Sequence, residues 1–349
     1  MKIAVVGAGV SGLSTTAALL DRDADVVCYE STGPMSQRSA GASRIFRLAH
    51  GAPELVELAE RSLHEFRAWS ARLGAELVRT TGTAVTGECV PEWAAAMAAA
   101  GAAHRVAEAT PELLGTEVRA IDGPALVDLG GGVLDAEAVG RYLFGRARSA
   151  VVHDPVFRLE RTAAGRARVH SVSGTQDFDA CVLVAGAGSS HLGADVGLYV
   201  PAGLYHHARF TFPLLDGGAR PVCLIEKSQA WRPGVTTYQH LVAPGQWAVG
   251  THFDPADSAW ELGRDHVVGT GRRLTLEYVR ENLPGVDEQV LDELYCTITA
   301  SWGDGYGAQR EGPFLTLYGD NLFKLAPVIG TVLAEAALCD DAPKPVLHG

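Results

Sequence analysis

A glycine-rich turn near the N-terminus constrains this chain more than any other feature. Residues 2–7, KIAVVG, read as a buried strand and residues 10–21 as a helix, and the junction VVGAGVSGL carries Gly7, Gly9 and Gly12 in GxGxxG order. In this context the first glycine allows a tight turn, the second lets the backbone approach a pyrophosphate, and the third lets the helix pack closely on the strand. A helix N-terminus also favours phosphate. The sequence therefore predicts a dinucleotide site.

Two further strands extend this predicted site. DVVCYE, residues 25–30, ends at Glu30, whose carboxylate can accept hydrogen bonds from ribose hydroxyls. DACVLVAGAG, residues 179–188, is a buried strand that ends in glycines. A glycine turn without a ligand is the alternative, and it requires the motif, its context and the acidic residue to coincide by chance. The predicted contacts are Gly7, Gly9, Val10, Ser11, Gly12 and Glu30, with Gly186 and Ala187 from the later strand.

Composition excludes several classes of protein. The chain has 349 residues, enough for about two domains. Its net charge of −12 argues against nucleic acid or an anionic membrane surface as a partner. The six cysteines lack the spacing of zinc or disulfide frameworks, so we expect no metal. No leader segment and no apolar run long enough to cross a bilayer is evident, and we expect a soluble, cytoplasmic monomer.

The periodicity of apolar residues predicts a fold of the α/β class, α+β overall. Helices are predicted at 53–73, 94–103, 135–148, 257–282 and 327–339, an antiparallel sheet at 205–253 and a strand at 314–318. The early strand–helix–strand unit and the later glycine-ended strand indicate a Rossmann-like domain built from discontinuous segments. We assign residues 1–75, 135–200 and 300–349 to this cofactor domain, and 76–134 and 201–299 to a substrate domain with a mainly antiparallel sheet.

The stretch SAGASRIFRLAHG, residues 39–51, places Arg44 and Arg47 three positions apart. On a helical turn the two guanidinium groups would share one face and repel each other. Such a pair is either a solvated basic turn or a site for an anion. Only four lysines occur in the chain, so a lysine close to a motif carries weight; these are Lys2, Lys227, Lys324 and Lys344.

At SRIFRLAHG the chain resembles the monomeric sarcosine oxidase and N-methyltryptophan oxidase type of FAD-dependent amine oxidoreductase, which has a glutathione-reductase-like FAD fold. NLFKLAPVIG, residues 321–330, is similar to the family's Gly-Phe-Lys-Phe segment and puts Lys324 in the lysine's place. YCTIT puts Cys296 where the family has its flavin-linked cysteine, and GTH aligns His252 with an active-site histidine. The resemblance covers nearly the whole chain.

The resemblance implies FAD as the cofactor and a small substrate related to amino acids. Arg47 and Lys324 would hold the substrate's carboxylate, which a guanidinium and an ammonium bind strongly. Arg44 would lie against the flavin, and His252 and Tyr238 would line the substrate face unless they are structural. For Cys296 two outcomes stay open, a covalent bond to the flavin or an inert core thiol. We also expect Ser43 and Phe323 to contact the cofactor, and we interpret His206 and His207 as structural.

Some positions depart from the family pattern. Family oxidases carry a lysine that activates dioxygen about four residues before the histidine, and Ala248 stands there in this chain. Lys227 is the only other internal candidate, and Asn321 and Leu322 replace the family's His-Gly. We expect hydride transfer from an amino or cyclic imino acid, with dioxygen or another electron acceptor. The alternatives are an aromatic hydroxylase that uses NAD(P)H, a dehydrogenase that reacts poorly with dioxygen, and a nucleotide-binding protein without chemistry.

Overall fold

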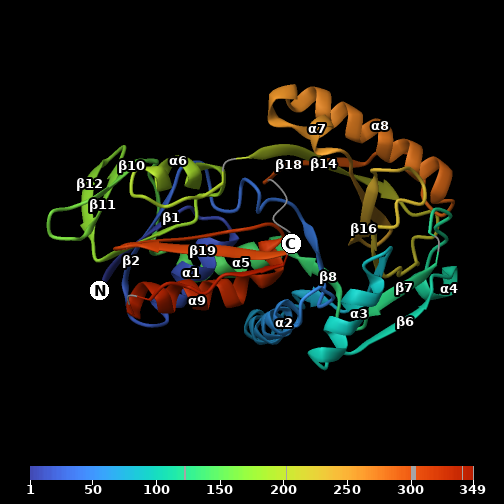
Figure 1. Cartoon of the computed structure of the whole chain (residues 1–349), viewed down its shortest axis with the longest axis horizontal. Coiled ribbons are helices and arrows are strands. Elements are labelled where there is room, and N and C mark those ends of the chain that lie inside the picture. Colours follow the sequence, from blue (N-terminus) through green and yellow to red (C-terminus); the bar gives the residue numbers. More distant parts are fainter. Residues whose placement is uncertain (122, 202, 300–303, 340, 349) are drawn as a thin grey trace.

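Two large sheets organise the molecule (Figure 1). The computed structural model describes residues 1–121, 123–201, 203–299, 304–339 and 341–348. The first sheet has seven strands in the order β21-β19-β20-β13-β1-β2-β9, and its five strands from β20 to β9 run parallel. The strands are β1 (Lys2–Val6), β2 (Asp25–Glu30), β9 (Val151–His153), β13 (Ala180–Leu183), β19 (Asp304–Glu311), β20 (Phe314–Tyr318) and β21 (Val346–His348).

The second sheet has eight strands in the order β18-β14-β17-β16-β15-β5-β7-β6. Its pairs are antiparallel except for β15 with β5. Helix α8 (Arg264–Asn282) covers one face of this sheet beside β14 and β17 (Figure 1). The strands are β5 (Thr83–Thr86), β6 (His104–Glu108), β7 (Pro124–Asp128), β14 (Leu204–Pro213), β15 (Cys223–Glu226), β16 (Thr236–Ala243), β17 (Gln246–His252) and β18 (Asp292–Thr299).

Two small sheets complete the strands. In the first, β3 (Ser43–Phe46) and β4 (Val78–Arg79) both pair with β8 (Gly132–Asp135). The second consists of β10 (Val156–Arg161), β11 (Ala167–Ser171) and β12 (Gly174–Phe178). The remaining helices are α1 (Val10–Leu20), α2 (Pro53–Leu73), α3 (Val90–Ala99), α4 (Pro111–Leu114), α5 (Ala136–Ala147), α6 (Ser189–Ala194), α7 (Pro255–Ser258) and α9 (Ala326–Cys339), with short 3-10 turns η1 (Gly186–Gly188), η2 (Trp260–Leu262) and η3 (Leu322–Leu325).

This architecture confirms the predicted fold class, a parallel Rossmann-like sheet joined to a mainly antiparallel one. Segments far apart in sequence assemble the parallel sheet. The domain boundaries stay a prediction, and residues 300–303 at one of them lie outside the described part. Two element predictions were wrong in part: the helix predicted from residue 257 begins only at Arg264, after the positive φ of Gly263, and the helix predicted at 94–103 spans Val90–Ala99.

The stretch with the paired arginines is a strand rather than a helical turn. Residues Ser43–Phe46 form β3, and Arg44 lies opposite Leu134 of β8. Because side chains alternate along a strand, positions three apart do not share a face. The expected repulsion between Arg44 and Arg47 on one helical face was therefore wrong, and the two guanidinium groups enter different surroundings.

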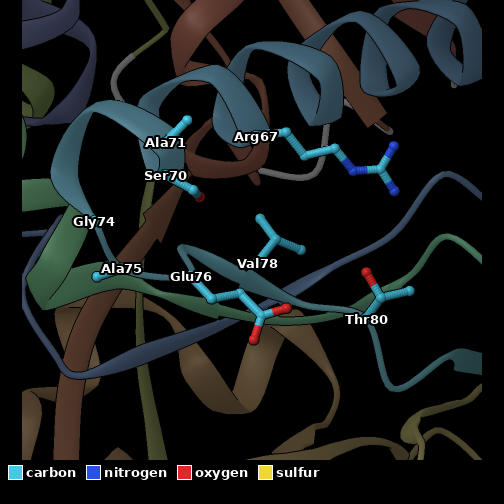
Figure 2. A pocket seen from close by; sticks show the side chains of 8 residues that line it. All are labelled: Arg67, Ser70, Ala71, Gly74, Ala75, Glu76, Val78 and Thr80. Carbon is cyan, nitrogen blue, oxygen red and sulfur yellow. The ribbon is translucent and has the colours of Figure 1, made fainter.

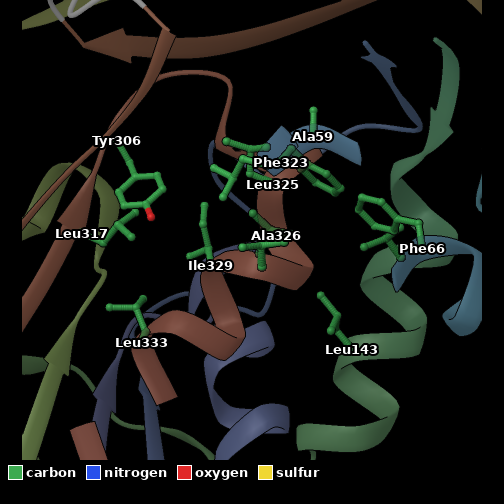
Figure 3. Packing of buried hydrophobic residues seen from close by; sticks show 14 of the residues in the cluster. Ala59, Phe66, Leu143, Tyr306, Leu317, Phe323, Leu325, Ala326, Ile329 and Leu333 are labelled. Carbon is green, nitrogen blue, oxygen red and sulfur yellow. The ribbon is translucent and has the colours of Figure 1, made fainter. Parts of the chain in front are cut away.

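Helix α9 lies in the core between α1, α2 and the parallel sheet (Figure 3). Phe323, Leu325 and Ile329 are buried there, and a Cβ at Gly330 would meet the backbone of Ser14 in α1 at 2.7 Å. Leu322–Cys339 is the one helical stretch among the described residues that is long and apolar enough to cross a membrane, which corrects the expectation of no such run. Since 67% of that window is buried inside the protein, we interpret it as a core helix.

Candidate active site

The glycine loop has the geometry that a pyrophosphate requires. Gly7 follows β1 with a φ of +105°, and a Cβ there would lie 2.6 Å from the carbonyl oxygen of Val184. A Cβ at Gly12 would overlap the carbonyl oxygen of Gly7. Helix α1 begins at Val10, with Ser11 in its first turn, so its free N–H groups face the loop. These glycines leave room for a dinucleotide and let β13 approach the loop.

Ser39 is a residue of this site that the sequence motifs do not reveal. Its hydroxyl oxygen accepts the N–H of Val10 at 3.0 Å, and a Cβ at Gly9 would lie 3.2 Å from the same oxygen. A pocket of about 430 Å³ opens beside Ser39, between residues 34–41 and α5. The pocket thus borders the N-terminus of α1, where phosphate is expected.

Glu30 lies at the end of β2, as predicted, and supports the loop. Its carboxylate accepts N–H groups of Ala8 and Thr32, each at 2.8 Å, and of Gly33 at 3.2 Å. Burial alone would raise the pKa of Glu30, but these N–H donors lower it, so the group is ionised. Gly186 and Ala187 form η1 directly after Ala185, whose Cα lies 2.8 Å from a Cβ built on Gly7. The structure therefore brings the predicted cofactor residues of β1, β2 and β13 together.

One face of the eight-stranded sheet carries the predicted substrate-facing residues. His207 on β14 lies opposite Cys296 on β18, and the thiol Sγ is 3.5 Å from His207 Nδ1. The ring centroids of Tyr238 and His252 are 5.3 Å apart, and each ring lies within 6 Å of the His207 ring. A Cβ at Gly250 would overlap the Tyr238 ring, so the glycine lets this ring lie across the strand. His207, interpreted as structural from the sequence, lies on this aromatic face.

The two histidines of this aromatic face are neutral at physiological pH. Burial lowers the pKa of His207 well below its usual range, and the charge of His252 adds to the effect. Burial and the charge of Lys227 lower the pKa of His252 to about 4. The His252 side chain is nevertheless exposed. His206 points the other way and contacts Trp260 and Tyr295.

The half-buried Arg44 and the buried Arg209 bring two guanidinium groups to the same face. Arg44 lies 5.4 Å from the ring centroid of Phe323 and donates to backbone carbonyl groups of Ser43, Arg38 and Ala40. Arg209 donates to His240 Nε2 at 3.1 Å, and its Nε has no partner within the described residues. Burial and the nearby Arg209 lower the pKa of Arg44 to about 10. One buried and one half-buried cation without a carboxylate partner favour an anionic ligand at this place.

Ser43 links the two domains at this point. Its hydroxyl lies 2.9 Å from His240 Nε2, on the strand β16 of the second sheet. Arg209 also donates to this hydroxyl, at 3.5 Å. Ser43, a predicted cofactor residue, thus holds β3 against the aromatic face. The segment from Ser39 to Ser43 connects the phosphate loop to this contact.

Arg47 and Lys324 converge, as predicted, and an unpredicted carboxylate lies between them. Arg47 Nη2 donates to Asp304 Oδ2 at 2.6 Å, and Lys324 Nζ is 3.7 Å from Asp304 Oδ1. His50 Nδ1 lies 3.2 Å from Asp304 Oδ2. All four side chains are buried or nearly so. This group of Arg47, His50, Asp304 and Lys324 is called the cationic cluster below.

The cationic cluster carries a net positive charge. Burial alone would raise the pKa of Asp304, but Arg47 and Lys324 hold it well below its usual range, so Asp304 is an anion. Burial lowers the pKa of His50 well below its usual range, so this ring is neutral. Burial and the charge of Arg47 lower the pKa of Lys324 to about 7, although Asp304 opposes the shift. Below that pH two cations face one carboxylate, and a further anion is favoured.

Comparison with known proteins agrees with this site. The sequence model of a family described as FAD dependent oxidoreductase matches residues 2–336. The chain belongs to this family. A search of curated protein sequences gave no significant match.

Solved structures of two oxidases and one dehydrogenase share the whole fold. NikD, an unusual amino acid oxidase essential for nikkomycin biosynthesis, is 21% identical with a TM-score of 0.82 over 99% of this chain and 98% of its own. L-proline dehydrogenase from P. horikoshii is 15% identical with a TM-score of 0.79, over 98% and 94%. Glycine oxidase from Geobacillus kaustophilus is 17% identical with a TM-score of 0.77, over 96% and 94%. At these identities the comparison establishes the fold.

For a member of this family, the glycine loop and the buried cations fit FAD. The dinucleotide half has its phosphate loop at Gly7–Gly12, and the flavin half would meet Arg44, Arg209 and Cys296 further along. Ala248 lies opposite His240, so no lysine projects from β17 toward Arg209. Arg209 donates to His240, the residue opposite Ala248.

A larger surface pocket lies elsewhere. It has a volume of about 470 Å³ at the C-terminal end of α2 (Figure 2), and is lined by Arg67, Ser70, Ala71, Gly74, Ala75, Glu76, Val78 and Thr80. None of the residues predicted for cofactor or substrate lines it. The cationic cluster and the aromatic face, which hold the predicted substrate residues, are therefore the candidate site. Among the described residues, no group of three or more His, Cys, Asp and Glu side chains could hold a metal ion.

Proposed function

We propose that this FAD-dependent oxidoreductase oxidises the C–N bond of an amino acid or cyclic imino acid to the imine. The observation that carries the proposal is the buried cationic cluster, in which Arg47 and Lys324 meet with a single carboxylate between them. Bound FAD would accept a hydride from the substrate's α-carbon. NikD, the proline dehydrogenase and the glycine oxidase act on amino acids or imino acids by their names, which supports the same class of substrate here.

The cationic cluster would orient the substrate. A carboxylate bound by its positive surplus gains charge-assisted hydrogen bonds of about 1.5–3 kcal/mol each. Anchoring one end of the substrate fixes the α-carbon relative to the flavin, which is an effect of proximity. The aromatic face of His207, Tyr238 and His252 would contact the rest of the substrate. Since both histidines are neutral, this face suits an uncharged amine, the form from which hydride leaves.

Arg44 and Arg209 would stabilise negative charge on the reduced cofactor. Arg209 is buried and Arg44 is half-buried, and no carboxylate forms an ion pair with either in the described part of the chain. Their charges thus favour reduction of the flavin. Because Ala248 replaces the family's lysine, dioxygen or another acceptor stays open for the second half of the reaction.

We propose that Cys296 is bonded covalently to the flavin. Burial raises the pKa of the Cys296 thiol, whereas the charge of Arg44 opposes the shift and favours the thiolate. The sulfur lies 3.5 Å from His207 Nδ1. The S–H bond and one C–H bond of the flavin's 8α-methyl group would break and an S–C bond would form, and the two electrons left on the flavin would pass to the acceptor. After acid precipitation the yellow colour is expected to stay with the protein, and to move to the supernatant in Cys296→Ser. Colour released from the wild-type protein would contradict the bond.

Binding of a carboxylate is expected to weaken as pH rises through about 7. Lys324 is protonated below its pKa of about 7 and neutral above it, so the cluster loses one positive charge over this interval. The measurement is the dissociation constant of benzoate, which has no amine, from flavin difference spectra between pH 6 and 9. We expect a rise of up to about tenfold per pH unit, and a flat profile in Lys324→Met. A flat wild-type profile would remove Lys324 from the anion site.

Anaerobic reduction separates the proposed function from its alternatives. Amino and imino acids are expected to bleach the flavin absorbance without NADPH. Bleaching by NADPH but by no amino acid would favour the aromatic hydroxylase. Bleaching by neither would favour a nucleotide-binding protein without this chemistry.

A further inference from the structure

Asp304 limits what Arg47 can offer to a substrate. Arg47 Nη2 is engaged by Asp304, and Nη1 donates to the carbonyl oxygen of Ala49 and lies 3.1 Å from His50 Nδ1. These contacts engage part of the guanidinium's five N–H donors, so an incoming carboxylate would share Arg47 with Asp304. Lys324 differs, because its Nζ is 3.7 Å from Asp304, longer than a hydrogen bond. Its N–H groups are available for a second anion.

Lys227 brings another cation to this place from a different strand. It follows β15 directly, and its N–H donates to the carbonyl oxygen of Thr86 at 3.2 Å, which continues the pairing of β15 with β5. Gly87 has a φ of +105°, and a Cβ there would lie 2.6 Å from the carbonyl carbon of Lys227. The close approach of the two backbones thus depends on this glycine. It fixes the position of the Lys227 backbone, from which the side chain extends.

The ammonium of Lys227 lies beside the cationic cluster. Its Nζ is 4.5 Å from the centre of the Trp93 indole, and the guanidinium carbon of Arg47 is 4.7 Å from the same centre. The His50 ring stacks on this indole as well. The charge of Lys227 contributes to lowering the pKa of both Lys324 and His252, so it acts on the cluster and on the aromatic face.

Lys227 is free to bind a ligand. Its side chain is exposed, and it forms no ion pair with any carboxylate in the described ranges. Two ammonium groups that repel each other are both stabilised when an anion lies between them. An ammonium over an indole keeps its N–H donors, since the cation–π contact uses only the charge. Lys227 and Lys324 therefore both have N–H groups available for a ligand.

We propose that Lys227 and Lys324 together bind the substrate's carboxylate, while Arg47 holds Asp304 in place. This assignment rests on the proposed function and specifies which residues recognise the substrate. It makes Lys227 a residue that determines specificity for anionic substrates, and it makes Arg47 a positioning residue. Under this assignment Lys227 does not activate dioxygen, which is the other role that a lysine at this site could have.

The test compares Lys227→Met and Lys227→Arg with the wild-type holoenzyme, using benzoate and its neutral isostere benzamide as probes. Lys2→Met is the matched control, because Lys2 also lies over an aromatic ring, that of Phe178 at 5.3 Å, outside the site. Flavin difference spectra give each dissociation constant. We expect Lys227→Met to raise that of benzoate at least tenfold, Lys227→Arg to restore it to within about threefold of wild type, and benzamide to be unaffected.

A second measurement excludes the alternative role. The flavin is reduced with dithionite and its reoxidation by dioxygen is followed, and the rate is expected to be unchanged in Lys227→Met. Slower reoxidation together with an unchanged benzoate constant would overturn the proposal and assign Lys227 to the acceptor. If no amino acid bleached the flavin, the proposed function would be refuted. The benzoate test would still apply, because benzoate binding needs no turnover.

Discussion

Replacing Arg47 with Met is expected to lower kcat/KM for a carboxylate substrate by about 10²- to 10³-fold, mainly through KM. The change removes one of the two cations around Asp304 and leaves that buried carboxylate facing Lys324 alone. The substrate's carboxylate then meets a cluster without surplus charge. Losing about 3–4 kcal/mol of charge-assisted binding gives this range, at 1.4 kcal/mol per tenfold. Steady-state kinetics against substrate concentration measures the effect.

Two control variants make the Arg47 prediction specific. The double variant Arg47→Met/Asp304→Asn removes the cation together with its counter-ion and restores the net charge of the cluster. We expect it to recover at least tenfold of the lost affinity, because the substrate's ligands are Lys227 and Lys324. Arg67→Met, on the exposed side of α2, controls for loss of an arginine elsewhere. An Arg47→Met enzyme with unchanged KM would contradict the role of the cluster.

Replacing Gly12 with Ala is expected to abolish retention of FAD. The new methyl group would overlap the carbonyl oxygen of Gly7, which belongs to the backbone and cannot rotate away. Either α1 moves away from β1 or the loop opens, and both changes destroy the pyrophosphate site. The ratio of flavin to protein absorbance after gel filtration under non-denaturing conditions measures the loss. For this variant the apoprotein must be compared by thermal unfolding, so that loss of the cofactor is distinguished from loss of the fold.

Gly145→Ala is the matched control for Gly12→Ala. Gly145 also lies within a helix, α5, and a Cβ there would meet no atom within 4 Å. This variant is expected to keep its FAD and to gain about 0.5–1 kcal/mol of stability, because alanine favours a helix over glycine. A Gly12→Ala protein that binds FAD as fully as Gly145→Ala would show that the third glycine does not hold the loop.

The sequence predicted those parts of the site that depend on local patterns. The loop of Gly7, Gly9 and Gly12 needs only a strand, a turn and a helix in succession, and the structure has all three. Helix α2 was predicted at its observed bounds because its apolar positions recur at helical spacing. Lys324 could be paired with Arg47 only through the resemblance to a family, since nearly the whole chain lies between them.

Other residues could not be found because their roles depend on pairing between distant strands. Asp304 begins β19 and reaches Arg47 only when β19 joins the parallel sheet. Arg209 and His207 face the site because β14 pairs with β17 and β18, and nothing in the sequence near them indicates which face is buried toward β3. Strand β3 itself forms by pairing with β8, some 90 residues later, and a local pattern favoured a turn there.

The most direct test of the account is to reduce the flavin anaerobically with an amino acid and, separately, with the carboxamide of the same amino acid. The two molecules differ in the charge that Lys227 and Lys324 would bind and share the C–N bond to be oxidised. The efficiency is the rate constant of flavin reduction divided by the dissociation constant. For the amino acid that bleaches the flavin fastest, we expect it to be at least 100-fold higher than for the corresponding amide. Equal efficiency would contradict recognition of the substrate through its carboxylate.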